Sequence, residues 1–373
     1  MNPRPARNAK PLKIALTFAV VLHSIFYISF WQAFRPRPGA EVTDFIAYYS
    51  FGRAERIYDV EADRVVQERI RPGVMPMNHA PYFVPLLRLV CDEDYYASYY
   101  RWLLFVLLGV ATCAFLAYRL TDSGNDSPLL AAAFVLTFSP IQVSLLGAHD
   151  TAFILLGILV WLWAIENKRS VLAGAALSLV TLKPQLALML ALPMAFHYRR
   201  AWWSFFAACL VLGAYSLILA GWQGVAGYLH IISLTAEGQS YGTYQEVMYN
   251  LRGTLIRWGV AFKTSGVIAW AAYFTALAVL CKFWRPNRAY VGVAVIVTVF
   301  FSPHLHFHDL SLLVVPALCL NSWRVVALAL TSLLLHVTNV SGVGRYAVPY
   351  ALMAGLSALL LLTREPRRTS VSD

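Results

Sequence analysis

The polar residues of this chain that could do chemistry lie where long apolar runs end. Asp44, Tyr48 and Gly52 are spaced by four residues, so they share one face if the segment 41–54 is helical. A carboxylate beside a tyrosine at the edge of an apolar run can accept a proton from a hydroxyl group, which is the task of a general base. The alternative is that Asp44 only caps a helix, since aspartate is common at that position.

Lys183 lies between two apolar half-segments and is followed by Pro184 and Gln185. Proline breaks a helix, and an ammonium group at membrane depth is costly. The pattern predicts a broken helix whose lysine meets a fixed anion such as a phosphate. The alternative is a lysine whose ammonium group extends to the lipid headgroups. Arg252, near the end of a long polar segment, is a second candidate anion contact.

The densest polar cluster is the segment 302–309, which holds His304, His306, His308 and Asp309. The three histidines alternate, so they point to one side if the chain is extended, whereas only His304 and His308 align in a helix. We expect these residues to hydrogen-bond a phosphate or a sugar hydroxyl. The alternatives are a plain polar cap and a metal site, although a zinc site needs more ligands in good geometry. We assign no metal ligands.

The elements that position these residues follow from the composition. Of 373 residues, 59% are hydrophobic and 13% are charged, against roughly 45–50% and about 25% in an average globular domain. One soluble core cannot bury such an apolar surplus. The composition excludes disordered and fibrous chains and ordinary soluble enzymes, and it predicts an all-α polytopic membrane protein.

Apolar runs recur to the end of the chain, and we expect about twelve transmembrane helices, with a range of about 9 to 13. Several runs are shorter than the ~20 residues of a perpendicular span, and the pair around Lys183 fits a hairpin that crosses only partly and lines a cavity. The expected spans are 14–34, 101–120, 128–146, 150–166, 170–182, 185–197, 201–220, 264–284, 289–302, 309–321, 324–340 and 347–363.

Two segments, 35–100 and 221–263, are too long for simple connectors. We expect both to be extracytoplasmic parts of one domain, 1–373, and chemistry to be on that face. The first should carry surface helices: the charged stretch 61–71 fits an interfacial helix or a solvated helix with internal ion pairs. The apolar run 80–90 is too short to span and fits a re-entrant or surface-lying segment.

The net charge of +11 is distributed along the chain as the positive-inside rule requires. Basic residues flank the first apolar run and occur in or beside the short inner loops, whereas acidic residues lie mostly in the outer segments. We therefore expect both termini in the cytoplasm and contact with membrane lipids. A nucleic-acid partner is disfavoured because no basic stripe with interleaved aromatic residues is present.

As an ordered set, these motifs resemble glycosyltransferase family 87, polytopic enzymes with the glycosyltransferase C-type fold. The resemblance covers about 40–310. It departs at the turn 147–150, where relatives tend to show a Gly-Gln pair. The motifs that carry it are Asp44 with Tyr48-Tyr49, Gly52-Arg53-Ala54, Tyr58-Asp59, the segment around Pro81, Lys183-Pro184-Gln185, Asn250-Leu251-Arg252-Gly253 and Ser302-Pro303-His304.

The resemblance implies a plasma-membrane hexosyltransferase with an extracytoplasmic site, a polyprenyl-phosphate sugar donor and Asp44 as the catalytic base. Mannose is the sugar that it favours. It also implies that the cluster around His304 lines the donor phosphate. We expect Lys183 and Arg252 to share that task, and Tyr48 and Gln185 to contact substrate.

One working carboxylate predicts inversion; a covalent intermediate would need a second carboxylate, for which Asp150 and Asp309 are candidates. No cofactor is required, because fixed cations can balance the charge that develops on the donor phosphate. The acceptor, a lipid or a glycan, and the oligomeric state stay open. The rival function is a transporter or flippase of lipid-linked sugars, which broken helices also suit, although the chain shows no internal repeat.

Overall fold

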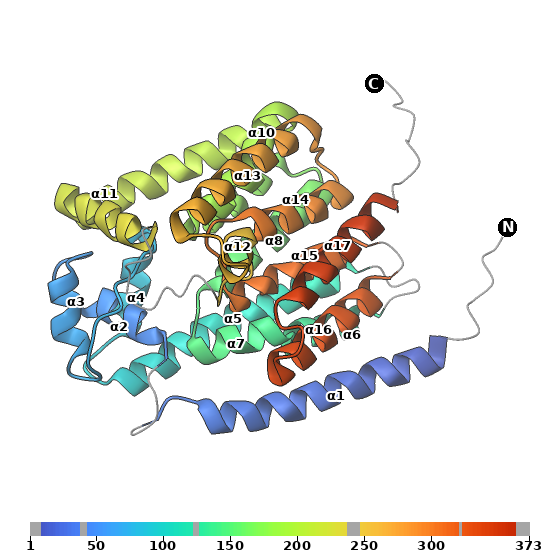
Figure 1. Ribbon diagram of the computed structural model, residues 1–373, viewed down its shortest axis with the longest axis horizontal. Helices are drawn as coiled ribbons and strands as arrows, with labels where there is room; N and C mark the ends of the chain where they lie inside the picture. The colour runs from blue at the N-terminus through green and yellow to red at the C-terminus, as the bar shows by residue number, and fades with distance from the viewer. Residues whose placement is uncertain (1–8, 38–42, 122–126, 237–246, 321–322, 363–373) are drawn as a thin grey trace.

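The computed structural model describes residues 9–37, 43–121, 127–236, 247–320 and 323–362 (Figure 1). Within these ranges the chain is built from helices and contains no strand. Two sets of residues from the sequence analysis lie outside the described residues. One is the stretch 241–244 of the second long segment; the other is the basic residues Arg4, Arg7, Arg364, Arg367 and Arg368 near the two ends of the chain.

Five of the described helices are long and apolar enough to cross a membrane. They are α1 (Ala9–Phe34), α5 (Tyr95–Leu120), α11 (Arg199–Ala236), α13 (Phe262–Phe283) and α16 (Arg324–Ser341). A sixth candidate is the bent pair α6 (Pro128–Thr137) and α7 (Ser139–Gly147), whose axes differ by 46°. The chain is therefore a helical protein with several apolar spans.

The remaining apolar runs form shorter helices. A 14-residue helix is about 21 Å long, which is less than the ~30 Å hydrocarbon core of a bilayer. Each of the twelve expected segments contains helix, whereas the number that cross the membrane stays a prediction. The shorter elements are α8 (Thr151–Glu166), α9 (Ser170–Leu177), η2 (Ser178–Leu182), α10 (Pro184–His197), α14 (Arg288–Phe301), η4 (Phe307–Leu313), α15 (Val314–Cys319) and α17 (Ala347–Leu362).

The first long segment folds into four short elements, gathered at one end of the molecule (Figure 1). They are α2 (Phe45–Arg53), α3 (Val60–Gln67), η1 (Pro81–Phe83) and α4 (Val84–Val90). The Asp59 side chain caps α3 by accepting hydrogen bonds from two backbone N–H groups. Gly52 lets α2 approach α4, because a Cβ atom there would lie 3.1 Å from the backbone of Leu87. This packing fixes the end of α2, the helix that Asp44 precedes, against α4.

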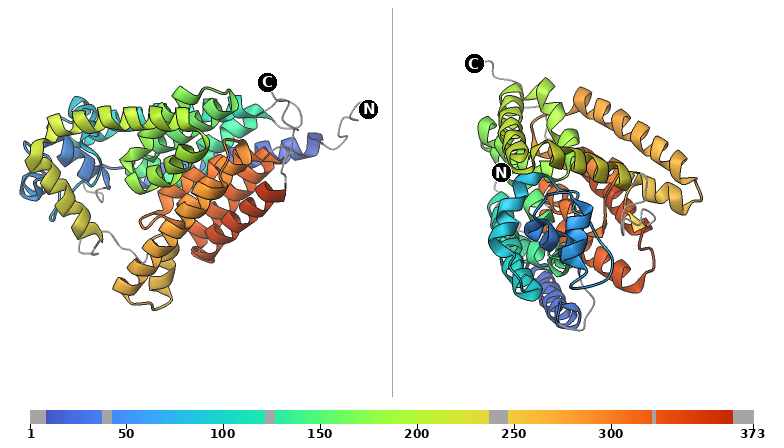
Figure 2. Two further views of the ribbon diagram at one scale, coloured as in Figure 1. Left: turned by 90° about the horizontal axis from the view of Figure 1, so that it is seen from above. Right: turned by 90° about the vertical axis from the view of Figure 1, so that its left-hand side faces the viewer.

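The long helix α11 changes direction at Gly221, whose φ of 62° is in the left-handed region that glycine tolerates. Figure 2 shows the helix running along the bundle and then turning away beyond this point. The second long segment, 221–263, thus begins with helix and also contains α12 (Leu251–Arg257).

Candidate active site

The helix break at Lys183 is confirmed. η2 ends at Leu182, α10 begins at Pro184, and Lys183 between them is non-helical. Its side chain is buried, and the ammonium nitrogen lies 2.5 Å from Oδ1 of Asp309. The alternative, a lysine whose ammonium group extends to the headgroups, is wrong, because the charge is held inside the bundle by a carboxylate.

Asp309 uses both carboxylate oxygens inside the protein. Oδ1 pairs with Lys183, and Oδ2 accepts a hydrogen bond of 3.0 Å from the backbone N–H of His306, which caps η4. The side chain is 1% exposed. Asp309 therefore fixes Lys183 and the start of η4 from behind rather than facing an open surface.

The three predicted histidines come together. The backbone of His306 is extended and turns into η4 after it, and the rings of His304, His306 and His308 follow one another as a histidine row. Successive ring centroids are 4.8 and 5.9 Å apart. Burial lowers the pKa of His306 to about 4, so this ring is neutral at pH 7. Among the residues that the structure describes, no three His, Cys, Asp or Glu side chains are arranged to hold a metal ion.

Asp44 lies immediately before α2, but its side chain makes no capping hydrogen bond. The capping alternative is therefore wrong. The carboxylate is 57% exposed, and its Oδ2 lies 3.4 Å from Nε2 of His149. Asp44 thus combines an open face with one contact inside the protein.

His149, which the sequence analysis did not assign to the site, joins Asp44 to the histidine row. Its ring stacks on that of His308, with centroids 3.9 Å apart and planes at 17°. The turn that carries it ends α7, and Ala148 there is left-handed with φ of 51°. A Cβ atom on Gly147 would lie 2.2 Å from Nε2 of His149, so only glycine leaves room for the ring. The one hint in the sequence is a short polar turn between two apolar runs.

Asp150 connects the same turn to the first long segment. Its Oδ1 accepts a hydrogen bond of 3.0 Å from the hydroxyl of Tyr48, and its Oδ2 lies 2.9 Å from Nε2 of His79. Burial and the neighbouring Asp150 raise the pKa of Tyr48, which keeps the phenol a neutral donor. Tyr48, one helical turn after Asp44, is buried and held by Asp150.

The turn is also held from α5. The indole N–H of Trp102 donates to the carbonyl of Ala148 at 2.7 Å, and the hydroxyl of Tyr99 donates to that of Leu146 at 3.0 Å. Both donors are fully buried. The turn that carries His149 and Asp150 is therefore fixed through its backbone as well as through its side chains.

Arg252 and Gln185 lie on α12 and α10, which both pack against α13. The guanidinium of Arg252 is buried in α12 and lies over the ring of Phe262, 4.6 Å from its centroid. α12 is tied to the histidine segment, because the side-chain amide of Asn250 donates to the carbonyl of Ser302 at 2.8 Å. Gln185 is half-buried in the first turn of α10.

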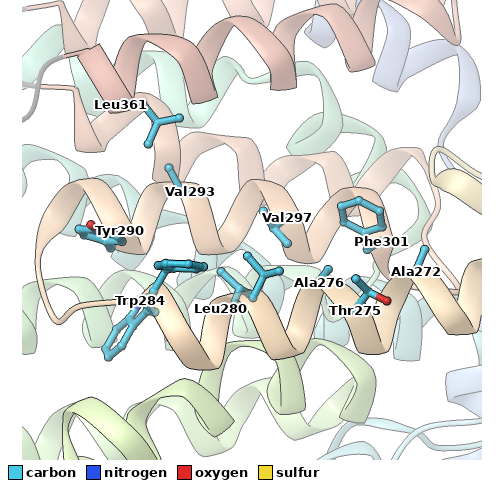
Figure 3. A pocket seen from close by; sticks show the side chains of 12 residues that line it. Ala272, Thr275, Ala276, Leu280, Trp284, Tyr290, Val293, Val297, Phe301 and Leu361 are labelled. Atoms are coloured by element: carbon cyan, nitrogen blue, oxygen red, sulfur yellow. The ribbon is translucent and has the colours of Figure 1, made fainter.

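An apolar groove of about 520 Å³ lies between α13 and α14 (Figure 3). It follows α14 from Tyr290 to Phe301, the residue that precedes the histidine segment. Its walls carry almost only hydrocarbon and aromatic groups. The lining residues are Ala272, Thr275, Ala276, Val279, Leu280, Phe283, Trp284, Tyr290, Val293, Val297, Phe301 and Leu361.

The model of glycosyltransferase family 87 matches residues 79–316, well over half of the chain. The chain belongs to glycosyltransferase family 87. The match confirms the resemblance and contains every residue of the site except Asp44 and Tyr48, which precede it. A comparison with curated proteins finds no similar sequence. As a member of family 87 with several apolar helices, the chain is a multi-pass membrane glycosyltransferase, with a sugar donor and an acceptor as its partners.

Proposed function

We propose that this family 87 member transfers a hexose, with mannose as the first candidate, from a polyprenyl-phosphate donor to a lipid or glycan acceptor. The observation that carries the proposal is the contrast between three carboxylates. Asp150 and Asp309 are 2% and 1% exposed and occupied by internal partners, whereas Asp44 is 57% exposed. Of the three, Asp44 is the one that can meet an acceptor hydroxyl.

In this mechanism Asp44 removes the acceptor proton while the acceptor oxygen attacks the anomeric carbon. The bond between that carbon and the donor phosphate oxygen breaks, and polyprenyl phosphate leaves. One open carboxylate favours a single displacement with inversion, since a covalent intermediate needs a second carboxylate facing the sugar.

The donor phosphate would face His304, His306 and His308. Neutral imidazoles can donate N–H groups to phosphate oxygens, and such prearranged donors stabilise charge that develops on a leaving group. Lys183 adds a positive charge behind them, already balanced by Asp309. Arg252 and Gln185 are the further proposed donors at the edges of this segment. With these groups present the proposed reaction requires no cofactor.

We further propose that the donor tail lies in the groove between α13 and α14. A chain there would lead directly to the histidine segment, because Phe301 at one end of the groove is followed by Ser302 and Pro303. The proposed setting is the plasma membrane, with about twelve spans in the C-type arrangement, both termini in the cytoplasm and the site on the outer face. The positive-inside distribution of charge supports this orientation.

The deciding experiment measures sugar transfer in detergent from a short-chain polyprenyl-phosphate mannose to extracted lipid and glycan acceptors. Asp44→Asn should be produced and folded normally but lose about 100-fold or more in kcat, the scale of general-base catalysis. Glu93→Gln, an exposed acid in the same segment, is the matched control and should keep wild-type activity. Near-normal transfer by Asp44→Asn would contradict the assignment, and a transporter would form no product in this assay.

A further inference from the structure

We propose that His149 is a positioning residue that orients the Asp44 carboxylate and connects it to the histidine segment facing the donor. This inference rests on the proposed role of Asp44 as the base. Nε2 of His149 lies 3.4 Å from Oδ2 of Asp44, and the ring stacks on His308 at 3.9 Å. One side chain thus touches both halves of the site.

Asp44 needs such a partner. Its side chain makes no capping hydrogen bond and is more than half exposed, so nothing else that the structure describes fixes its rotamer. A base works efficiently only when it is held in the reacting geometry, and a misplacement of about 1 Å can cost roughly 100-fold in rate. His149 is only 11% exposed and can supply this constraint.

His149 is itself rigidly held. The ring stacks on His308. Its Nε2 edge occupies the space that a Cβ atom on residue 147 would otherwise take. The next residue, Asp150, is bonded to Tyr48 and lies in contact with His79. The imidazole therefore presents a fixed edge to Asp44, which is what a positioning group requires.

The charge state suits this role. Burial lowers the pKa of His149, against the attraction of three carboxylates, Asp44, Asp150 and Asp309; Lys183 lowers the pKa further. The ring of His308, which stacks on that of His149, adds no charge beside it when His308 is neutral. At 3.4 Å, Nε2 of His149 contacts Oδ2 of Asp44 and leaves Oδ1 for the acceptor hydroxyl.

The test compares kcat of His149→Leu with that of His149→Gln in the transfer assay. The leucine variant should lower kcat by about 10- to 100-fold, since the carboxylate is no longer held. Glutamine keeps an N–H donor near the position of Nε2 and should restore most of the activity. A purely structural role would instead reduce the yield of folded protein and leave kcat per folded molecule unchanged.

Gly147→Ala offers an independent route, because its Cβ would displace the His149 ring without removing it. It should reproduce the kinetic defect of His149→Leu, and the double variant should be no worse than either single one, as for two changes that remove the same interaction. Gly109→Ala, where the added Cβ meets only ordinary contacts at 3.5 Å or more, is the matched control.

The outcomes separate the two proposals when Asp44→Asn is measured alongside. If Asp44→Asn stays active, both the base and its positioning residue are refuted. If Asp44→Asn is inactive but His149→Leu keeps wild-type kcat, or loses a kcat that glutamine does not rescue, only the role of His149 is overturned.

Discussion

At the scale of single residues, the three carboxylates of the site differ in what they already touch. Asp309 neutralises a buried lysine, Asp150 is bound by a phenol and an imidazole, and Asp44 keeps an open face. The same chemical group thereby anchors a lysine, connects two segments and, in the proposed mechanism, transfers a proton. Exposure and partner, rather than residue type, separate these roles.

The Lys183–Asp309 pair allows a direct test of anchoring against catalysis. Lys183→Met leaves a buried carboxylate without a cation, which typically costs about 3–5 kcal/mol. We expect a clear fall in the unfolding temperature in detergent and loss of transfer activity. In the double variant Lys183→Met with Asp309→Asn, stability should recover because no charge is left unpaired, while activity should stay low. A single variant as stable as the wild type would contradict the anchoring role.

Asp63 in α3 predicts a pH dependence of stability that is independent of catalysis. Burial raises the pKa of this carboxyl to about 7, from an ordinary value of 3.8. The folded state then binds more protons than the unfolded chain between these values, so the free energy of unfolding should fall as pH rises from about 4 to about 7. Asp63→Asn should flatten this dependence in thermal unfolding measured across that range.

Glu61→Gln serves as the control for Asp63, since Glu61 lies on the same helix but its side chain is 73% exposed. It should leave the pH dependence of the wild type unchanged. If the stability of Asp63→Asn depended on pH as strongly as that of the wild type, a group other than Asp63 would be the cause of the pH dependence.

At the scale of elements, the site is assembled from places where helices end. The break before α10, the left-handed end of α7, the start of α2 and the extended chain before η4 each deliver one part of it. Helix ends leave backbone donors and acceptors without partners inside the helix. Such places are therefore suited to hold polar side chains in an otherwise apolar bundle.

The proposal that the donor tail lies in the groove between α13 and α14 can be tested by filling that groove with a larger side chain. Val297→Trp should raise KM for a long-chain polyprenyl-phosphate donor by about tenfold or more, since ~0.8 kcal/mol is lost for each methylene group that is no longer buried. KM for a donor with only a few isoprene units should stay at the wild-type value. Steady-state kinetics with both donors measures the difference.

Val211→Trp on the lipid-facing surface of α11, where Val211 is 68% exposed, is the matched control for the groove. It should change neither KM. Equal effects of Val297→Trp on long and short donors would place the tail elsewhere.

Several residues of the candidate site could be singled out from the sequence, for physical reasons. Lys183 and the histidine segment stand out because polar groups beside apolar runs are costly and need a purpose. Asp44 stands out because it opens the first long segment after an apolar run. The helix segments follow from apolar run length, and the break at Lys183 follows from the proline after it.

The rest depends on distant packing. Asp150 meets Tyr48 across 102 residues, and Lys183 meets Asp309 across 126. No local pattern encodes such pairs, so Asp309 was expected at the donor rather than behind Lys183. In the sequence, His79 and His149 resemble ordinary loop residues. Only the folded chain shows that His79 contacts Asp150 and that His149 contacts Asp44.

At the scale of the whole molecule, the positive-inside distribution predicts on which side each loop lies. Cysteine replacing Glu68 in the first long segment should react with an impermeant maleimide in intact cells. Cysteine replacing Asn167, between α8 and α9, should react only after the membrane is permeabilised. Both positions are exposed, whereas the five native cysteines are buried or half-buried. The reverse pattern would invert the proposed topology.

The long separation between Lys183 and Asp309 also has a consequence for synthesis. A ribosome that adds about 5–20 residues per second needs roughly 6–25 s to make the 126 residues between them. During that interval the nascent chain carries Lys183 without the carboxylate that pairs with it at 2.5 Å in the folded protein. Unfinished chains of this protein should therefore be more exposed to membrane proteases than finished ones, and Asp309 is the residue whose arrival ends that exposure.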